Sequence, residues 1–425
     1  MSLVEKNLTQ KNIELTENHP EFINRREKEQ KLYATVPKYL RELFLDQARP
    51  IEQVYLSSPD DEFSLRVRKY ERDDGTEYSA ALKDRGSRLY GTLDRFEVST
   101  PISQEAFEHF ANNPDLPRVQ KLRAEPLEGV VVDFIDEANL QLVEVEHPDL
   151  KERVYLSQYM AELAKGHLVD MSYDRQLDSE YIAHSLSKAE RTPSPETLDA
   201  FSDRVVGEMV AQYALGKKQV VVGLTGMSGS GKTTATKAIQ QKVTELFGES
   251  FTPLILSTDD YHFGKKHLEE TYGAPWTEWD DPRTYNTKEL AHDLALIAEG
   301  HSLIRRHFDF ASEEVVFDEE VAPSPFVVVE GLYAGSQDLT AVRDLHFELP
   351  TSIATAVGRD IRRLVIENRA NHVFPTPESR LKYQLETALP LYLSQERPRR
   401  HSFSASARPM AERAFMLERL RQLES

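Results

Sequence analysis

Residues 226–233 form a glycine-rich run, Gly-Met-Ser-Gly-Ser-Gly-Lys-Thr, that matches the phosphate-binding pattern G-x-x-x-x-G-K-T. A β-branched run at residues 219–223 precedes it, and a stretch with helical spacing at residues 234–247 follows it and ends at Gly248. In this context of strand, loop and helix, the glycines turn backbone N–H groups inward and the helix N-terminus adds partial positive charge. The run therefore predicts a site for the phosphates of a nucleoside triphosphate.

The residue types within the loop predict how the phosphates are held. We expect Lys232 to reach the β- and γ-phosphate oxygens and the Thr233 hydroxyl to bind Mg²⁺. The expected cofactors are accordingly ATP and Mg²⁺. The residues expected to bind ATP are Gly226, Ser228, Gly229, Ser230, Gly231, Lys232, Thr233 and Thr234.

The composition limits the classes of protein that this chain can belong to. Its 425 residues suffice for two or three domains. It contains no cysteine, which excludes disulfides and thiolate metal sites and suits a reducing cytosol. The formal charge of −19 argues against general nucleic-acid binding, although a local basic pocket for a polyanion stays open. No run approaches the ~20 apolar residues of a membrane span, so we expect a soluble, cytoplasmic protein.

The pattern of residues changes along the chain and predicts four regions. Residues 1–48 are highly charged and are expected to form a solvated arm with a helix from about Glu21 to Leu45. Residues 49–150 show short alternating segments typical of antiparallel β-structure, and residues 151–217 are expected to be a helical connector with a linker at 187–196. From residue 218 to 425, strands alternate with helices, which indicates a parallel sheet covered on both faces.

Acidic residues end two apolar strands of this last region. Asp259 and Asp260 follow the strand at residues 254–258, and Glu330 ends the strand at residues 325–329. The carboxyl ends of parallel strands form the ligand crevice, so these acids are expected near the phosphates. One aspartate could accept the proton of a substrate hydroxyl group, and Glu330 stands where an acid holds Mg²⁺ directly or through water. The alternative is that the aspartates cap a following helix.

The order of these motifs resembles the uridine kinase and phosphoribulokinase family of P-loop kinases over about residues 218–400. Besides the loop, the resemblance rests on Leu-Ser-Thr-Asp-Asp-Tyr at 256–261, Trp-Asp-Asp-Pro at 279–282, Arg-His-Phe-Asp-Phe at 306–310 and Val-Glu-Gly at 329–331. It implies an enzyme in which Asp259 is the catalytic base beside Lys232. The substrate-binding residues that it implies are Asp280, Arg306 and Phe308, and the implied lid arginines are Arg362, Arg363 and Arg369.

Two departures from the family pattern concern the acceptor. In uridine kinases a tyrosine and a histidine help to hold the pyrimidine base, whereas this chain has Phe308 and Glu313 at those positions. The lid also lacks the family's spacing of arginines. We therefore expect use of ATP but little or no activity on uridine.

Basic residues recur in pairs along the β-rich region. Residues i and i+2 of a strand face the same side, so Arg66 with Arg68 and Lys121 with Arg123 each project two cations in one direction. Glu144 and Glu146 do the same with two carboxylates. Such a set suits a polyphosphate with a metal, and the alternative is a salt-bridged solvent face.

The order of these pairs resembles the CYTH family of triphosphate tunnel enzymes over about residues 51–147. The resemblance implies an eight-stranded barrel that binds triphosphate through Arg66, Arg68, Lys83, Arg95, Lys121 and Arg123, and metal through Glu144 and Glu146. The family signature Glu-x-Glu-x-Lys is expected on the first strand, where residues 50–54 read Pro-Ile-Glu-Gln-Val and retain only Glu52. Ser99 replaces a second glutamate after Glu97. We therefore expect this domain to bind tripolyphosphate but to hydrolyse it weakly.

The expected fold is thus a CYTH-like antiparallel β-barrel of the α+β class, followed by an α/β P-loop kinase domain with a parallel sheet. The expected function is ATP- and Mg²⁺-dependent phosphoryl transfer to a hydroxyl of a small nucleoside-like metabolite. The barrel is expected to bind inorganic polyphosphate. Two alternatives stay open. The barrel could hydrolyse tripolyphosphate or a nucleoside triphosphate, or it could act as a sensor that regulates the kinase.

Overall fold

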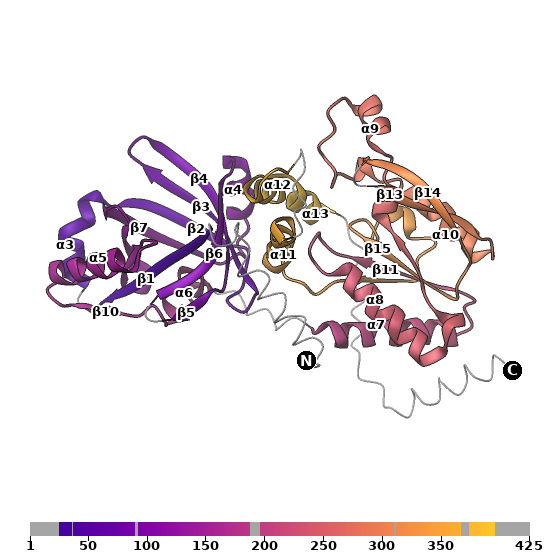
Figure 1. Cartoon of the computed structure of the whole chain (residues 1–425), viewed down its shortest axis with the longest axis horizontal. Helices are drawn as coiled ribbons and strands as arrows, with labels where there is room; N and C mark the ends of the chain where they lie inside the picture. Colours follow the sequence, from indigo (N-terminus) through magenta and orange to yellow (C-terminus); the bar gives the residue numbers. More distant parts are fainter. Residues whose placement is uncertain are drawn as a thin grey trace. The chain divides into compact units, whose positions relative to one another are not determined.

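The computed structural model describes residues 25–35, 37–89, 92–187, 196–309, 312–366 and 374–395. The chain divides into two compact units (Figure 1). The barrel unit comprises residues 1–193 and 352–386, and the kinase unit comprises residues 194–351 and 387–425.

Eight antiparallel strands of the barrel unit close into a barrel. Around the barrel the order is β1-β9-β8-β7-β2-β3-β4-β6, and β6 pairs again with β1, where Arg95 lies opposite Glu27. Closure leaves these strands without a free edge. The expected barrel is therefore confirmed. Its strands are β1 (Arg26–Ala34), β2 (Arg49–Tyr55), β3 (Phe63–Arg72), β4 (Gly75–Asp84), β6 (Thr92–Pro101), β7 (Arg118–Leu127), β8 (Val130–Ile135) and β9 (Leu140–Glu146).

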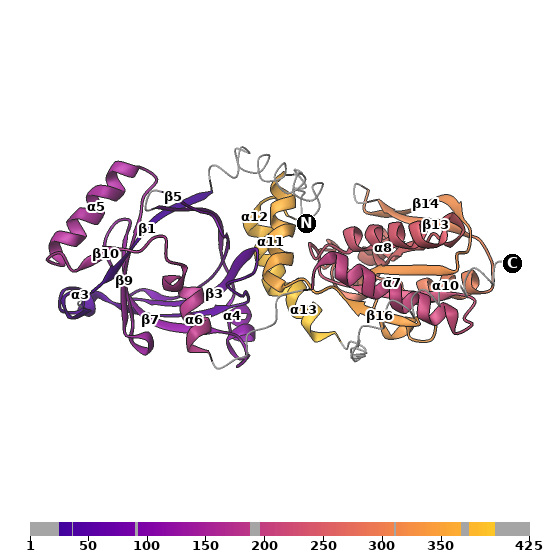
Figure 2. The ribbon, with the colours of Figure 1, turned by 90° about the horizontal axis from the view of Figure 1, so that it is seen from below.

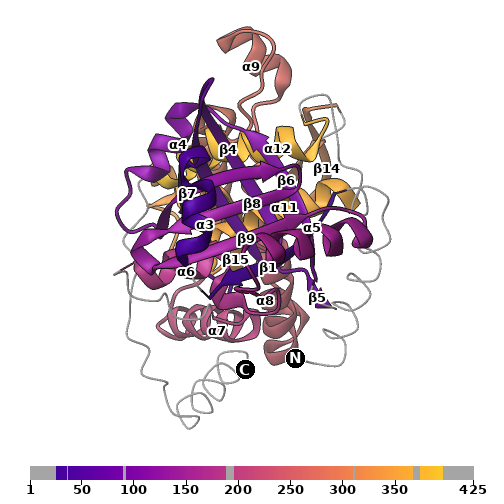
Figure 3. The ribbon, with the colours of Figure 1, turned by 90° about the vertical axis from the view of Figure 1, so that its left-hand side faces the viewer.

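Short elements surround the barrel. Helices α3 (Pro37–Phe44) and α5 (Leu150–Leu163) lie across β1, β8 and β9 (Figure 3). Leu40 and Met160 from these helices pack on Val132 and Val143, which alternate with inward-facing residues along the strands. This apolar cluster is therefore on the outer face of the barrel. The remaining elements are β5 (Ser87–Leu89), β10 (Leu168–Asp170), α4 (Gln104–Ala111) and α6 (Ser179–Leu186).

The N-terminal arm differs from the expectation. Residues 26–34 form strand β1, so the helix expected from Glu21 to Leu45 is wrong there, and within the described part of that range the α-helix is α3. The barrel consequently begins before residue 49. Strand β10 pairs with β1, although its residues were expected in the helical connector. The sequence did not predict β1 because the residues on its inner face are charged. The alternation of apolar and polar residues that is typical of a strand is therefore missing.

The barrel unit also takes in a part of the chain that was expected in the kinase. Helices α11 (Ile353–Ile366) and α12 (Pro377–Tyr383) belong to the barrel unit by packing. Gly358 of α11 lies so close to Phe63 that a Cβ atom added there would be 2.3 Å from the ring. The Arg359 Nε atom lies 2.8 Å from Glu62. The boundary expected at residue 218 therefore does not separate the two units completely.

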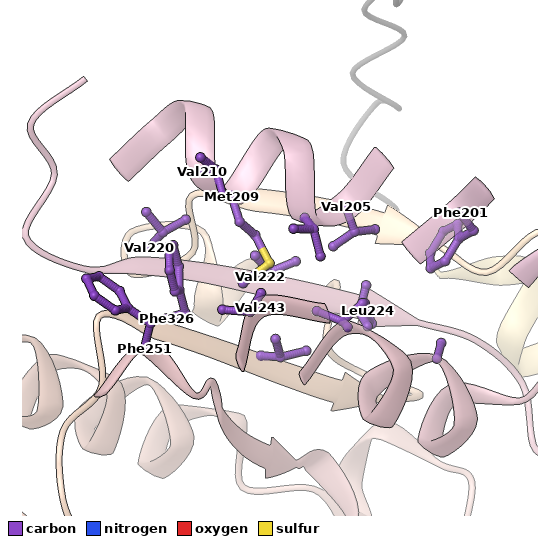
Figure 4. Close-up of a cluster of buried hydrophobic side chains, with 14 of the residues drawn as sticks. Phe201, Val205, Met209, Val210, Val220, Val222, Leu224, Val243, Phe251 and Phe326 are labelled. Carbon is purple, nitrogen blue, oxygen red and sulfur yellow. The ribbon is translucent and has the colours of Figure 1, made fainter. Parts of the chain in front are cut away.

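The kinase unit is built on a parallel sheet. Its strand order is β12-β15-β11-β16, formed by Leu254–Ser257, Phe326–Gly331, Val220–Thr225 and Leu345–Glu348. Helix α7 (Leu198–Ala214) presents Phe201, Val205 and Met209 to one face of β11, where Val222 and Leu224 meet them (Figure 4). Helix α8 (Lys232–Phe247) packs into the same core.

Helix α10 (Thr287–Ala298) covers the other face of the sheet. Its Leu290 and Leu294 pack on Val221 and Val327. Both faces of the sheet are thus covered, which confirms the α/β class expected for this region. The other elements are α9 (Lys265–Tyr272), α13 (Leu389–Ser394) and an antiparallel pair of strands, β13 (Leu303–Asp309) and β14 (Glu314–Val321).

We predict that Gly331→Ala destabilises the kinase unit by about 1–3 kcal/mol. Gly331 ends β15 with φ +144°, and an added Cβ atom would lie 1.7 Å from the Thr258 Oγ1 atom. The measurement is the free energy of unfolding in denaturant. The matched control is Gly207→Ala in helix α7, where an added Cβ atom meets nothing within 4 Å and should be neutral or stabilising. Equal stability of the two variants would contradict the prediction.

Candidate functional site

The glycine-rich loop connects β11 to α8, as its sequence predicts. Gly229 and Gly231 have positive φ angles of 78° and 91°, which favour glycine. A Cβ atom on Gly226 would lie 2.4 Å from the Ser230 Oγ atom, so the close turn also needs glycine there. The Lys232 ammonium donates to the carbonyl oxygens of Gly226 and Met227, at 3.0 and 3.1 Å. This geometry places one cation and the start of a helix at the same loop, which suits an anion.

Glu330 lies beside this loop. It stands opposite Leu224 of β11 and Ser257 of β12, because β15 runs between those two strands. Burial raises the pKa of Glu330, Lys232 opposes this shift, and the carboxylate of Asp259 adds to it. The Glu330 Oε2 atom is buried and has no hydrogen-bond partner within the described part of the chain. An unsatisfied carboxylate oxygen next to a phosphate loop fits a hydrated Mg²⁺ ion.

The two aspartates after β12 have different surroundings. Asp260 accepts a hydrogen bond from the Phe308 backbone N–H group, at 3.2 Å, and its carboxylate lies 3.3 Å from the His307 Nδ1 atom. It therefore holds strand β13 in place. Asp259 lies in a 3₁₀ turn directly after β12, with its backbone N–H group bonded to the Ser257 hydroxyl. Of the two carboxylates, Asp259 is the better candidate for a catalytic base.

An aromatic group lies next to these acids. The ring of His262 is stacked on Trp279, with ring centroids 5.9 Å apart, and it contacts Tyr285 and Phe308 edge-on at 4.5 and 4.4 Å. Burial lowers the pKa of His262 to about 4, so the ring is neutral at physiological pH. Neither of its ring nitrogens has a hydrogen-bond partner among the residues that the structure describes. Sequence reasoning missed His262, although it follows the Asp-Asp-Tyr segment directly.

Asp280 is held near this aromatic group. The Tyr333 hydroxyl donates a hydrogen bond of 2.7 Å to the backbone carbonyl oxygen of Asp280. Tyr333 packs in turn on Tyr285, with ring centroids 4.5 Å apart. The structure thus brings Asp280 and Phe308, two of the expected substrate-binding residues, to the same aromatic group.

Other residues expected to act in the kinase form ion pairs in the structure. Arg306, expected to bind substrate, forms ion pairs with Glu289 and Asp293 of α10, at 2.5 and 3.7 Å. Arg362, expected in a lid, lies 3.3 Å from Glu62 of the barrel unit. Arg363 lies 3.5 Å from Asp360 of the same helix. Arg369 and Phe310 lie outside the described residues.

A second candidate site fills the interior of the barrel. A complete Glu-x-Glu-x-Lys sequence lies on β1, at Glu27, Glu29 and Lys31, and not on β2 where it was expected. Carboxylate oxygens of Glu27, Glu29 and Glu146 lie within 4.8 Å of one another. Glu52 of β2 instead lies 3.8 Å from Arg118. The signal was present in the charged arm, but its alternating acids were interpreted as a solvated helix.

The acids of the interior are paired with most of the expected cations. Lys83 lies 2.7 Å from Glu27, and Arg95 contacts both Glu27 and Glu29, at 2.6 and 3.2 Å. Three carboxylates at such short range suit a divalent cation with oxygen ligands. Glu146 belongs to this group as expected, whereas Glu144 does not.

Glu144 faces the opposite charge. Its carboxylate lies 3.4 Å from the Lys31 ammonium and 3.1 Å from the Arg123 guanidinium. Although burial alone would raise the pKa of Glu144, these cations and Lys121 hold it well below its usual value. Glu144 was expected to bind metal; in the structure it is paired with these cations and is not part of the group formed by Glu27, Glu29 and Glu146. Arg123 and Lys121 are also paired with the fully buried Asp133.

Arg66 and Arg68 lie close together, and Arg68 is paired with Glu77 of β4 at 3.2 Å. Burial and the nearby Arg66 and Arg123 lower the pKa of Arg68 to about 10. The Arg66 Nε atom is buried without a hydrogen-bond partner in the described ranges. Arginines held close together in a buried space favour binding of an anion with several charges, because each guanidinium then gains a charge-assisted hydrogen bond.

Known proteins resemble both units. Residues 221–363 match the model of the phosphoribulokinase / uridine kinase family. A uridine kinase of Clostridium perfringens is 29% identical over 178 residues, which cover 41% of this chain and 80% of that protein. A protein of Arabidopsis thaliana named inorganic pyrophosphatase TTM2 is 28% identical over 187 residues, which cover 40% of this chain but only 25% of that protein. A solved inorganic triphosphatase aligns at 21% identity with a TM-score of 0.23, covering 39% of this chain and 97% of that one.

Among the described helices, none is long and apolar enough to cross a lipid bilayer. The glycine-rich loop, the two strand-end acids and the match over residues 221–363 agree with one another. The closed barrel of eight strands and the signature on β1 agree with the second resemblance. Residues 221–363 thus form a region similar to the phosphoribulokinase / uridine kinase family, in the same chain as a CYTH-like barrel.

Proposed function

We propose that the kinase domain transfers the γ-phosphoryl group of ATP to a hydroxyl group of a small nucleoside-like metabolite. The observation that carries this proposal is the position of Asp259 and Glu330 at the ends of neighbouring parallel strands, close to Lys232 at the start of α8. Lys232 supplies positive charge for the phosphates, and Glu330 with Thr233 would hold Mg²⁺. The bound Mg²⁺–ATP complex supplies the phosphoryl group and neutralises part of its charge.

Asp259 acts on the acceptor in this proposal. Its carboxylate accepts the proton of the acceptor hydroxyl while the hydroxyl oxygen forms a bond to the γ-phosphorus. The bond between that phosphorus and the oxygen bridging it to the β-phosphate breaks, and ADP leaves. Asp280 and the aromatic group around His262 and Trp279 bind the rest of the acceptor. A flat ring with adjacent hydroxyl groups, as in a nucleoside, suits this combination.

We predict that Lys232→Ala abolishes ATP-dependent transfer, because Lys232 contacts the phosphate loop and not the core.

Asp259→Asn should lower turnover by about 10²–10⁴-fold with little change in ATP affinity, which is the usual contribution of a general base. The matched control is Asp260→Asn, which removes a contact to β13 and should affect stability more than turnover. A larger loss of turnover in Asp260→Asn would show that the wrong carboxylate was assigned.

Uridine is predicted to be a poor acceptor. Phe308 is buried and offers no hydroxyl group to a base, and the Glu313 carboxylate is held by Lys265 at 2.5 Å. The measurement is ATP consumption with a panel of nucleosides, sugars and water, with Lys232→Ala as the blank. A kcat/KM on uridine at or above ~10⁴ M⁻¹s⁻¹, within the ordinary range of enzymes, would refute the prediction.

A second activity is favoured by the barrel interior: metal-dependent hydrolysis of tripolyphosphate or a nucleoside triphosphate. Weak hydrolysis was expected because the signature appeared broken, but the signature is complete at Glu27, Glu29 and Lys31. The three clustered carboxylates fit a divalent metal, which would activate water, and Arg66 with Arg68 would hold the phosphates. We therefore propose hydrolysis and not binding alone.

Glu27→Gln and Glu29→Gln are each predicted to lower Mg²⁺- or Mn²⁺-dependent phosphate release by about 10²-fold or more, the equivalent of the several kcal/mol that a bound metal contributes. The full chain with Lys232→Ala should serve as the parent, so that the kinase contributes no phosphate release. Glu52→Gln, which lies outside the acidic cluster, is the matched control. Equal rates in all three variants would count against a metal site at Glu27 and Glu29.

A further inference from the structure

Helix α6 closes one end of the barrel. Its Ile182 and Ala183 are buried in a cluster with Tyr55, Val119 and Leu142. Tyr55 is the last residue of β2, whereas Val119 and Leu142 lie near the beginnings of β7 and β9. Because these neighbouring strands are antiparallel, the end of one and the beginnings of the others lie on the same rim. Figure 2 shows α6 beside β7 at this part of the barrel.

The polar residues at the start of α6 reach cations of the interior. The Asp178 Oδ1 atom lies 3.1 Å from the Lys31 ammonium, and the Ser179 hydroxyl accepts a hydrogen bond of 3.2 Å from Lys121. The two lysines are buried, with 3% and 4% of their surfaces exposed. The segment thus contributes an acid to the interior in addition to the acids of the strands.

Glu180 anchors the same segment. Its carboxylate accepts hydrogen bonds from the Ser57 hydroxyl and the Arg85 guanidinium, and it is 5% exposed. The His184 Nε2 atom lies 2.8 Å from the Ser57 carbonyl oxygen, one turn further along α6. The apolar cluster and these polar contacts fix the position of Asp178 at the rim.

Asp178 is the nearest carboxylate to Lys31. Glu144 and Glu29 lie farther from the same ammonium, at 3.4 and 3.7 Å, and both belong to barrel strands. A phosphate group that approached Lys31 would meet the negative charge of Asp178 at contact distance, in a buried space where repulsion between like charges is strong. The phosphate and Asp178 therefore compete for one cation.

We propose that Asp178 is an internal competitor that lowers the affinity of the barrel for polyphosphate anions. This inference rests on the anion-binding function proposed above for the barrel. Bound tripolyphosphate takes the place of the Asp178 carboxylate at Lys31, and α6 gives way at its N-terminus. The contact acts as an autoinhibitory device, because a ligand must displace a carboxylate of the same chain before it fills the interior.

The test is a calorimetric titration of the full chain with sodium tripolyphosphate in the absence of divalent metal, so that binding is measured without turnover. Asp178→Asn keeps the shape of the side chain and its ability to begin a helix but removes the charge. We expect it to bind tripolyphosphate about 10-fold more tightly than the wild type, because a repulsive charge at contact distance is removed. Asp178→Ser is a second variant with the same expected direction.

The matched control is Asp174→Asn, the same chemical change four residues earlier, where the carboxylate caps a 3₁₀ turn through the Gln176 backbone N–H group. It should bind as the wild type does. Unchanged or weaker binding by both Asp178 variants, with thermal unfolding showing that they are folded, would overturn the proposal. Binding by the wild type that Arg66→Ala abolishes would uphold the anion site even if the competitor is refuted. An absence of binding in all variants would overturn both.

Discussion

Charges buried inside a protein must be paired, and this requirement organises the barrel. The Lys121 and Asp133 side chains are fully buried, and Asp133 also binds Arg123 through two oxygens. Cations on the barrel strands are paired with acids on neighbouring strands. Arg95 of β6, for example, lies opposite Glu27 of β1 and forms an ion pair with it. Ion pairs between neighbouring strands therefore set the distribution of charge inside the barrel.

The pairing is uneven, and the unevenness separates two kinds of site. Acids gather at Glu27, Glu29 and Glu146, whereas the buried Nε atom of Arg66 has no hydrogen-bond partner among the described residues. A metal with a polyphosphate would satisfy both groups at once, since each carries the charge that the other lacks. Removal of one partner would leave a buried charge unpaired, which explains why single substitutions here should have large effects.

The kinase unit depends on a different constraint, the parallel direction of its strands. Glu330 is about a hundred residues from the glycine loop in sequence, but β15 lies between β11 and β12 and brings it beside Lys232. Burial of the sheet on both faces leaves the carboxyl ends of the strands as the place where polar groups can meet a ligand. The arrangement explains why strand-end acids could be identified from the sequence.

Local patterns were sufficient to place the glycine loop between a strand and a helix, Asp259 and Glu330 at strand ends and the basic pairs on strands, because each placement follows from the spacing of a few neighbouring residues. Strand β1 was interpreted as a helical arm, since its inner face is charged and the usual apolar alternation of a strand is missing. Arg306 and Glu144 were expected at ligands, and the structure adds ion pairs of Arg306 with acids of α10 and of Glu144 with cations of the barrel. These ion pairs were not predicted because they join residues of different helices and strands.

The sequence by itself determined that the chain has a phosphate loop, a parallel sheet after it and a β-rich region before it. The tertiary structure alone decided which acids form a cluster, that α11 packs on the barrel unit and that α6 places Asp178 beside Lys31. The physical reason is that loops and strands arise from local spacing, whereas the charge state and the partner of a buried group depend on residues brought together by closure of the sheet.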